Sequence, residues 1–186
     1  MTIYPENILA GDWSLFLDRD GVINKRPFND YVKRIEDFEF LPGVFEALEI
    51  FKQFFTPIVV VTNQQGVGKG LMTHARLDEI HQWMLLEVRK NKGRIDAVFF
   101  CTDLAAESNN CRKPATYMAQ QAQQAFSEID FEKSIMLGDT ETDIQFGKNA
   151  GMKTILIGDE KCSLVPDMQF NSLLDFALFI QKITVG

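Results

Sequence analysis

Two carboxylates one residue apart follow an apolar run, where residues 15–17 lead into Asp18, Arg19, Asp20 and Gly21. Such a run is typical of a buried strand, and parallel strands bring their carboxyl ends to one edge of a sheet, where ligands bind. Side chains two positions apart lie on the same side of an extended segment, so both acids can act on one bound group. The same tripeptide is also typical of a strand that ends in a turn.

Three later segments carry side chains that could bind a phosphoryl group or a cation, each after a predicted strand or before a predicted helix. They are Thr62 and Asn63 after residues 58–61, Arg112 and Lys113 before Pro114, and Asp139 and Asp143 after residues 135–137. A hydroxyl and an amide can hydrogen-bond phosphate oxygens, and a lysine supplies a compact positive charge. Ordinary structural interpretations also exist, because Thr62 suits a strand, Lys113 a solvated surface, and Asp139 with Asp143 the first turn of a helix.

The order of these segments resembles the four signature motifs of the haloacid dehalogenase superfamily of phosphohydrolases. The resemblance covers nearly the whole chain and implies hydrolysis of a phosphomonoester through an aspartyl-phosphate intermediate. It implies that Asp18 is the nucleophile and that Asp20 is the general acid and base. It further implies a Mg²⁺ ion bound by the Asp18 carboxylate, the Asp139 carboxylate and the backbone carbonyl of Asp20. Asp143 would support these ligands without binding the ion directly. The resemblance also implies that Thr62 and Lys113 act in catalysis and that Asn63 and Arg112 bind the substrate.

Further segments are similar to the D-glycero-D-manno-heptose 1,7-bisphosphate phosphatases within this superfamily. They are Tyr31-Val32, Phe38-Glu39-Phe40, Pro42-Gly43, Thr62-Asn63-Gln64 and Cys111-Arg112-Lys113-Pro114. The resemblance implies removal of the C7 phosphate of a heptose bisphosphate, with the Arg112 guanidinium available to clamp a second phosphate. Since close relatives hydrolyse histidinol phosphate, that compound is the alternative substrate.

One loop departs from the pattern of that group, which commonly has a zinc site made by Cys-x-His and Cys-x-Cys. This chain has Asp103 and Asn109 at two of the four positions, and only Cys101 and Cys111 remain. Asp can bind zinc, but structural sites strongly favour Cys and His, so we expect no zinc here. The alternative is a site that Asp103 and another group complete. With Cys162 the chain has three cysteines, too few for a disulfide framework, and we predict that they are reduced.

Two other classes of protein share part of this pattern. A receiver domain of two-component signalling also has a phosphorylated Asp, a Thr, a Lys and Mg²⁺, but its Lys comes last, whereas here an acid pair follows Lys113. A non-catalytic binding protein is disfavoured because no catalytic position is missing. The glycines of residues 66–70 do not match a P-loop, and we expect a flexible loop there.

The elements that must position these residues alternate between two kinds. Strand-like runs cover residues 15–17, 58–61, 97–100, 135–137 and 154–157. Segments with helical spacing cover residues 44–54, 75–90, 116–126, 144–149 and 170–180. Near-continuous apolar strands that alternate with helices predict an α/β fold, a three-layer doubly wound domain with a mostly parallel, Rossmann-like sheet.

The spacing between the motifs limits what can cover the site. About 45 residues separate Asp18 from Thr62, and about 50 separate Thr62 from Lys113. One helix or helix–strand unit accounts for most of each gap, so we expect no large cap domain. The site should be open, with specificity set by the loops at residues 24–38, 64–72 and 101–112.

Composition sets the remaining limits. A chain of 186 residues fits one domain, residues 1–186, and its net charge of −7 with a pI near 4.9 argues against nucleic acid or an anionic membrane as partner. No apolar run is long enough for a membrane helix, and residues 1–6 do not resemble a signal peptide. We therefore expect a cytoplasmic enzyme, a monomer, acting on a small phosphorylated metabolite.

Overall fold

The computed structural model describes residues 13–185, so residues 1–6, on which the expectation about a signal peptide depends, lie outside the described part. Six strands form one parallel sheet in the order β3-β2-β1-β4-β5-β6. The strands are β1 (Trp13–Leu17), β2 (Phe55–Asn63), β3 (Ala97–Cys101), β4 (Ser134–Gly138), β5 (Lys153–Ile157) and β6 (Met168–Phe170). The α-helices are α1 (Val44–Phe51), α2 (Gln65–Gly68), α3 (His74–Lys90), α4 (Tyr117–Ala125), α5 (Glu141–Ala150) and α6 (Leu173–Val185), with short 3₁₀ helices η2 (Ile35–Asp37) and η3 (Phe131–Lys133).

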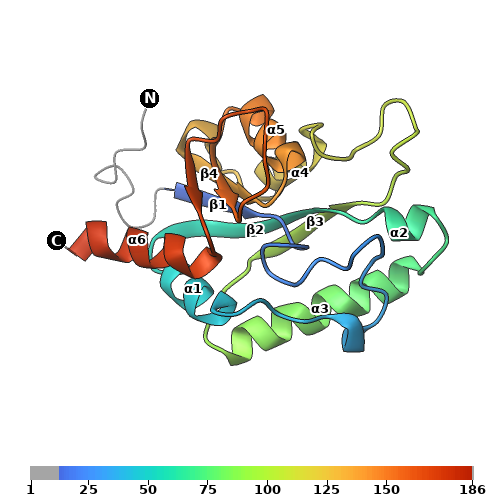
Figure 1. The fold of residues 1–186 in the computed structure, drawn as a ribbon, viewed down its shortest axis with the longest axis horizontal. Coiled ribbons are helices and arrows are strands. Elements are labelled where there is room, and N and C mark those ends of the chain that lie inside the picture. The colour runs from blue at the N-terminus through green and yellow to red at the C-terminus, as the bar shows by residue number, and fades with distance from the viewer. Residues whose placement is uncertain (1–12, 186) are drawn as a thin grey trace.

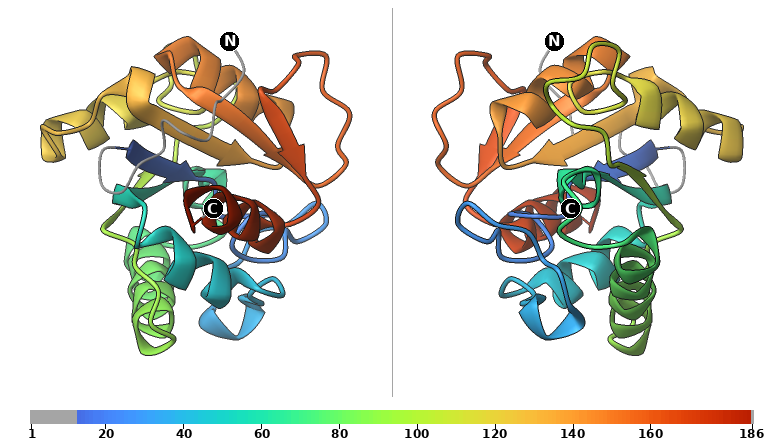
Figure 2. Two further views of the ribbon diagram at one scale, coloured as in Figure 1. Left: turned by 90° about the vertical axis from the view of Figure 1, so that its left-hand side faces the viewer. Right: turned by 90° about the vertical axis from the view of Figure 1, so that its right-hand side faces the viewer.

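Helices cover the sheet on both faces, with α1, α3 and α6 on one side and α4 and α5 on the other (Figures 1 and 2). The central strands β1 and β4 are buried along their whole length. Alternate residues of β1 enter opposite layers, because Leu15 and Leu17 pack in the cluster beneath α1, α3 and α6, and Phe16 packs in the cluster beneath α4 and α5. This two-sided burial explains why the strands have continuous rather than alternating apolar sequences.

The structure confirms the predicted fold class, and all five predicted strands are present within a few residues of their expected ends. Two details differ. The loop expected over residues 64–72 begins with the short helix α2, and the edge strand β6 was not predicted, because its three residues are only partly buried or exposed and form no apolar run. None of the described helices is long and apolar enough to cross a membrane.

The strand order has a switch point at its centre, which decides where a site can form. The chain goes from β1 outward to β2 and β3, then returns to β4 on the other side of β1. Connections that leave in opposite directions open a crevice at the carboxyl ends of the two central strands. Asp18 follows β1 and Asp139 follows β4, so both acids lie at this crevice.

Candidate active site

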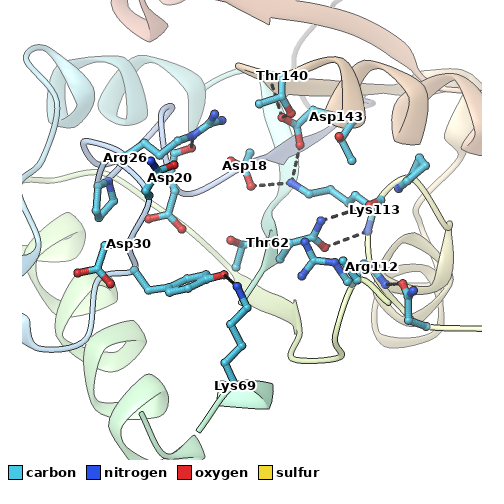
Figure 3. A pocket seen from close by; sticks show the side chains of 18 residues that line it. Asp18, Asp20, Arg26, Asp30, Thr62, Lys69, Arg112, Lys113, Thr140 and Asp143 are labelled. Carbon is cyan, nitrogen blue, oxygen red and sulfur yellow. Dashed lines mark hydrogen bonds and ion pairs between the residues drawn. The ribbon is translucent and has the colours of Figure 1, made fainter. Parts of the chain in front are cut away.

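A cavity of about 730 Å³ opens at the switch point and is lined by the segments that follow β1, β2, β3 and β4 (Figure 3). Its lining includes the predicted residues Asp18, Asp20, Thr62, Asn63, Arg112, Lys113 and Asp143, together with Arg26, Tyr31 and Lys69. Four segments far apart in the sequence thus meet at one place, as their order predicted. Asp139 is next to this cavity through its contacts with Arg26 and Asp18.

Lys113 forms the centre of the buried part. Its Nζ lies 2.5 Å from Oδ1 of Asp18, 2.6 Å from Oδ1 of Asp143 and 2.8 Å from the carbonyl oxygen of Val61. Burial alone would lower the pKa of this ammonium, but the charges of Asp143 and Asp18 outweigh burial and raise it. Lys113 therefore remains charged and is fixed by three acceptors, unlike a solvated surface lysine.

Asn63 holds the main chain of Lys113 in place. Its Nδ2 donates to the Lys113 carbonyl oxygen at 3.2 Å, and its Oδ1 accepts from the Lys113 N–H at 2.9 Å. Asn63 was predicted to bind substrate, and its side chain does line the cavity. Each end of its amide contacts the main chain of Lys113, so this geometry supports positioning of the lysine as a role beside the predicted one.

Three carboxylates converge beside Lys113. Ligand oxygens of Asp18, Asp139 and Asp143 lie within 4.8 Å of one another. Burial, opposed by Lys113, raises the pKa of Asp18 to about 6, and burial together with the charge of Asp18 raises the pKa of Asp139 to about 8. A bound cation would stabilise the charged forms of these crowded acids, which burial and mutual repulsion otherwise disfavour.

Arg26 supplies a positive charge at that position in this structure. Its Nη2 donates to Oδ1 of Asp139 at 2.6 Å, and its Nε donates to the carbonyl oxygen of Asp20 at 3.4 Å. These two oxygens are two of the ligands that the family resemblance implies for Mg²⁺. The donor set of carboxylates and one backbone carbonyl fits a hard divalent cation, and a cationic guanidinium already contacts part of it.

Two glycines allow this close approach. A Cβ on Gly21, whose φ is +100°, would lie 1.7 Å from a carboxylate oxygen of Asp139. A Cβ on Gly138 would lie 2.0 Å from the Cβ of Asp143. The glycine after the Asp-x-Asp pair is therefore required by the acid on the neighbouring strand, in addition to its positive φ.

Asp143 caps a helix, as one interpretation of the sequence suggested, and also forms an ion pair that the sequence did not predict. As the third residue of α5 its Oδ2 accepts from the N–H and the hydroxyl of Thr140, which begins the helix. Its Oδ1 forms the ion pair with Lys113. The helix cap thus fixes the carboxylate that holds the lysine.

Asp20 is surrounded by hydrogen-bond donors. Nη2 of Arg19 contacts both of its oxygens at 3.0 and 2.9 Å, Nδ2 of Asn24 donates to Oδ1 at 2.9 Å, and Nε2 of Gln64 donates to Oδ2 at 2.8 Å. Burial would raise the pKa of Asp20, but the Arg19 charge and these hydrogen bonds hold it below its usual value. Nε2 of Gln64 also donates to Oγ1 of Thr62 at 2.9 Å. The Thr62 hydroxyl can therefore donate its own proton into the cavity.

The opposite side of the cavity carries two cations, Lys69 and Arg112. Lys69 Nζ lies 3.1 Å from the Tyr31 hydroxyl, which also accepts from Gln65 at 3.2 Å. Within residues 13–185, no carboxylate forms an ion pair with Lys69 or Arg112. Two positive charges that form no ion pair among the described residues, in a chain of net charge −7, mark this side as a place for an anion.

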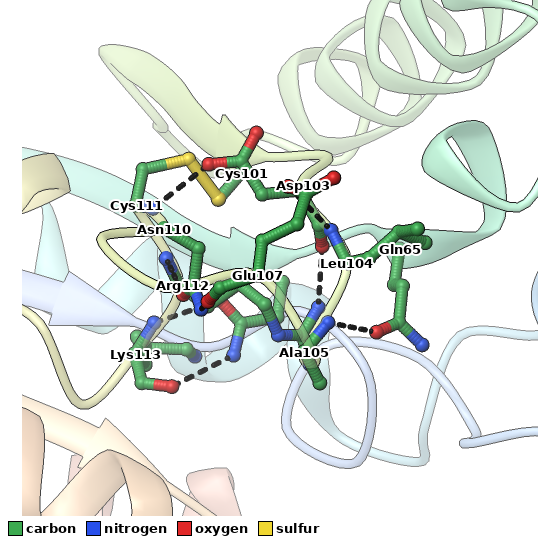
Figure 4. The surroundings of a disulfide bond; sticks show 11 residues. Gln65, Cys101, Asp103, Leu104, Ala105, Glu107, Asn110, Cys111, Arg112 and Lys113 are labelled. Atoms are coloured by element: carbon green, nitrogen blue, oxygen red, sulfur yellow. Dashed lines mark hydrogen bonds between the residues drawn. A yellow bond between two sulfur atoms is a disulfide. The ribbon is translucent and has the colours of Figure 1, made fainter.

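The structure contradicts the expectation that Cys101 and Cys111 are reduced. They form a disulfide with a Cα–Cα distance of 5.6 Å, because the loop returns to the end of β3 before it enters the segment of Lys113 (Figure 4). Oδ2 of Asp103 accepts from the Cys111 N–H at 2.9 Å. Ligand atoms of Cys101, Asp103 and Cys111 lie within 4.8 Å of one another.

Sequence reasoning missed several residues of this site. Arg26, Gln64, Tyr31 and Lys69 contact predicted site residues or line the cavity, but none was assigned a role, although Tyr31 and Gln64 belong to segments that carry the family resemblance. All four lie within the loops at residues 24–38 and 64–72, which were expected to set specificity. Their location was therefore available from the sequence, and their individual contacts were not.

Comparisons with known proteins agree with this geometry. A family model described as HAD-hydrolase-like matches residues 110–171. The chain is 34% identical over 173 residues to the D-glycero-alpha-D-manno-heptose-1,7-bisphosphate 7-phosphatase of Mycobacterium bovis, covering 90% of this chain and 91% of that protein. It is 37% identical over 145 residues to the D-glycero-beta-D-manno-heptose-1,7-bisphosphate 7-phosphatase of Helicobacter pylori, covering 77% and 82%.

A solved structure is similar over the same extent. The D,D-heptose 1,7-bisphosphate phosphatase from B. bronchiseptica, complexed with magnesium and phosphate, superimposes with a TM-score of 0.83 at 27% identity. The match covers 91% of this chain and 98% of that one.

Proposed function

The chain belongs to the D-glycero-D-manno-heptose-1,7-bisphosphate 7-phosphatase family of HAD-like hydrolases, and we propose on that basis that it removes the C7 phosphate of a heptose bisphosphate in a Mg²⁺-dependent reaction. The observation that supports this most strongly is the contact between Asp18 and Lys113 at the switch point, with Thr62 beside them in the same cavity. Relatives are named for both the alpha and the beta anomer, so the proposal includes either.

In the first step, Asp18 attacks the phosphorus atom, a bond forms between its carboxylate oxygen and phosphorus, and the bond from phosphorus to the sugar oxygen breaks. Asp20 gives a proton to that leaving oxygen. Lys113 and the Thr62 hydroxyl stabilise the phosphoryl oxygens. A bound Mg²⁺ would be held by Asp18, Asp139 and the Asp20 carbonyl and would neutralise charge on the phosphoryl group.

In the second step, Asp20 takes a proton from water, the water oxygen bonds to phosphorus, and the bond between phosphorus and Asp18 breaks to release phosphate. The donors around Asp20 favour its ionised form, which is the form that the second step needs. The negative charge of a bound phosphate ester has the opposite effect and favours the protonated form that the first step needs.

The second phosphate of the substrate is assigned to the cations across the cavity. Arg112 can bind it through two parallel hydrogen bonds, and Lys69 adds a second positive charge from the neighbouring loop. We further propose that the enzyme is a monomeric, single-domain protein of the cytoplasm, where its charged substrate is retained.

The test is phosphate release from heptose 1,7-bisphosphate, histidinol phosphate and simple sugar phosphates, with and without Mg²⁺. We expect Mg²⁺-dependent release with the bisphosphate preferred, and in Asp18→Asn a fall in kcat of roughly a thousandfold or more, because the nucleophile is lost while the shape is kept. If histidinol phosphate is preferred, histidinol phosphate and not a heptose bisphosphate is the substrate. Near-normal turnover by Asp18→Asn would refute the mechanism.

A further inference from the structure

Arg19, the residue between the two acids, is a fully buried cation at the edge of the site. Its side chain has no exposed area, and its guanidinium carbon lies 5.8 Å from the centre of the Phe38 ring. Its carbonyl oxygen accepts from the N–H groups of Ile23 at 2.9 Å and Asn24 at 3.1 Å. Both the main chain and the side chain of Arg19 are therefore fixed.

The guanidinium connects the site to α3. Nη2 contacts both carboxylate oxygens of Asp20, and Nη1 lies 3.0 Å from Nε2 of His81. His81 is 3% exposed, belongs to the buried face of α3 and packs its ring 5.3 Å from that of Phe100. A chain of contacts thus runs from the buried face of α3, through Arg19, to the carboxylate of Asp20.

The chemistry of the two groups fixes how His81 must be protonated. A guanidinium has five donors and no acceptor, so Nε2 of His81 must accept and cannot carry a proton. Burial, with the Arg19 charge, lowers the pKa of His81 to about 3, so the ring stays neutral in the range in which the enzyme would work. His81 is therefore a fixed neutral acceptor for a buried cation.

We propose that His81 is a positioning residue for the acid and base of the reaction, acting through Arg19 to hold the Asp20 carboxylate where it faces the cavity. This inference rests on the function proposed above. Without the acceptor on His81, Nη1 of Arg19 would be left without that partner in an interior site, and the guanidinium would turn or shift to find another. Asp20 would then keep the contacts from Asn24 and Gln64 but lose the one donor that reaches both of its oxygens.

The consequence should depend on the leaving group. Proton donation by Asp20 matters most for an alkyl phosphate, whose alkoxide is a poor leaving group, and little for an aryl phosphate. A misplaced Asp20 should therefore slow phosphoenzyme formation from an alkyl ester and leave the aryl ester nearly unaffected. A general loss of structure would slow both alike.

The experiment compares His81→Phe, which keeps a ring but removes the acceptor, with His81→Gln, whose amide oxygen can still accept. Ile80→Ala is the control, because it opens a cavity at the adjacent buried position of α3 and removes no polar group. Phosphoenzyme formation is measured in single turnovers with an alkyl phosphate and with p-nitrophenyl phosphate. For His81→Phe we expect a fall of about tenfold or more with the alkyl ester, less than about threefold with the aryl ester, and a nearly unchanged KM.

His81→Gln should recover most of the alkyl rate, and Ile80→Ala should affect both esters equally. Equal losses with both esters in His81→Phe, or no recovery in His81→Gln, would overturn the proposal and leave His81 a structural residue.

A second measurement does not depend on turnover. Side-chain N–H signals of Arg19 in ¹⁵N NMR should be resolved in the wild type and in His81→Gln, and broadened or lost in His81→Phe. If the wild type forms no phosphoenzyme from any ester, the proposed function fails. Loss of the Arg19 signals in His81→Phe would then still support the contact chain, and their persistence would overturn it.

Discussion

Removal of divalent cations should make the stability of this protein depend on pH in a window where most proteins show little change. Burial, with the charge of Asp18, raises the pKa of Asp139 to about 8 from the ordinary value of 3.8. From pH 6.5 up to about pH 8 the folded metal-free protein therefore holds on Asp139 a proton that the unfolded chain has released. Stability is greater where that proton is retained, so it should fall as the pH rises through this window.

The size of the effect follows from the linkage relation. A folded pKa of about 8 and an unfolded value of 3.8 give a loss of about 2 kcal/mol between pH 6.5 and 8.5. Asp18, with a pKa of about 6, increases this loss of stability by less than about 1 kcal/mol. His81, with a pKa of about 3, reduces the loss by a similarly small amount. In a chain of this length about 2 kcal/mol corresponds to a decrease in Tm of about 4–8 °C.

Mg²⁺ should reverse this dependence, because a cation bound by carboxylates requires them to be ionised and binds best where protons compete least. The assay is thermal unfolding at both pH values in EDTA and in excess Mg²⁺. Asp139→Asn removes the titrating group and should abolish the slope, whereas Glu160→Gln, which alters the other partner of Arg26, should retain it. The same slope in Asp139→Asn, or no difference between EDTA and Mg²⁺, would refute the assignment of Asp139 to a cation site.

Three further predictions follow from the site. Asp20→Asn should bind phosphate analogues with nearly unchanged affinity but form phosphoenzyme slowly, with a smaller defect for an aryl than for an alkyl phosphate; equal defects would exclude Asp20 as the acid. Arg112→Lys keeps the charge but loses the bidentate geometry, so KM should rise more for a bisphosphate than for a monophosphate; steady-state kinetics with no difference would argue against a second-phosphate clamp. Protein prepared without chelator should contain no stoichiometric zinc by elemental analysis, and about one zinc per chain that a Cys101→Ser, Cys111→Ser variant loses would contradict this.

Much of the fold could be predicted from the sequence because local and global signals agree in its centre. The runs around residues 15–17 and 135–137 are apolar on both faces, and only a parallel sheet between two helix layers buries such strands. The edge strand β6 carries no such signal, since its pairing with β5 is decided by the chain that precedes it and by Phe170 packing on the main cluster. Edges of sheets depend more on tertiary contacts than on pattern.

The site, like the fold, has a part that the sequence predicts and a part that it does not. Residues whose type is dictated by the chemistry were predictable, and the order of the motifs along the chain brought Asp18, Thr62, Lys113 and Asp143 together. Contacts that depend on side-chain direction were not predictable. Asn63 was predicted to bind substrate because its amide can hydrogen-bond a phosphoryl group, whereas its contacts with the main chain of Lys113, 50 residues later, depend on the fold.

The disulfide shows where reasoning from residue counts fails. An odd and small number of cysteines argues against a framework of several bridges, but it does not address one pair that the fold brings together. Cys101 ends β3 and Cys111 immediately precedes Arg112 and Lys113, so the bond closes the loop that shapes the cavity. A crosslink over a separation of 10 residues restricts the unfolded chain by about 3 kcal/mol in the entropic description. In the oxidised protein this bond therefore joins the beginning and the end of the loop. The Cys-x-His and Cys-x-Cys zinc pattern described in the sequence analysis would join the same two points.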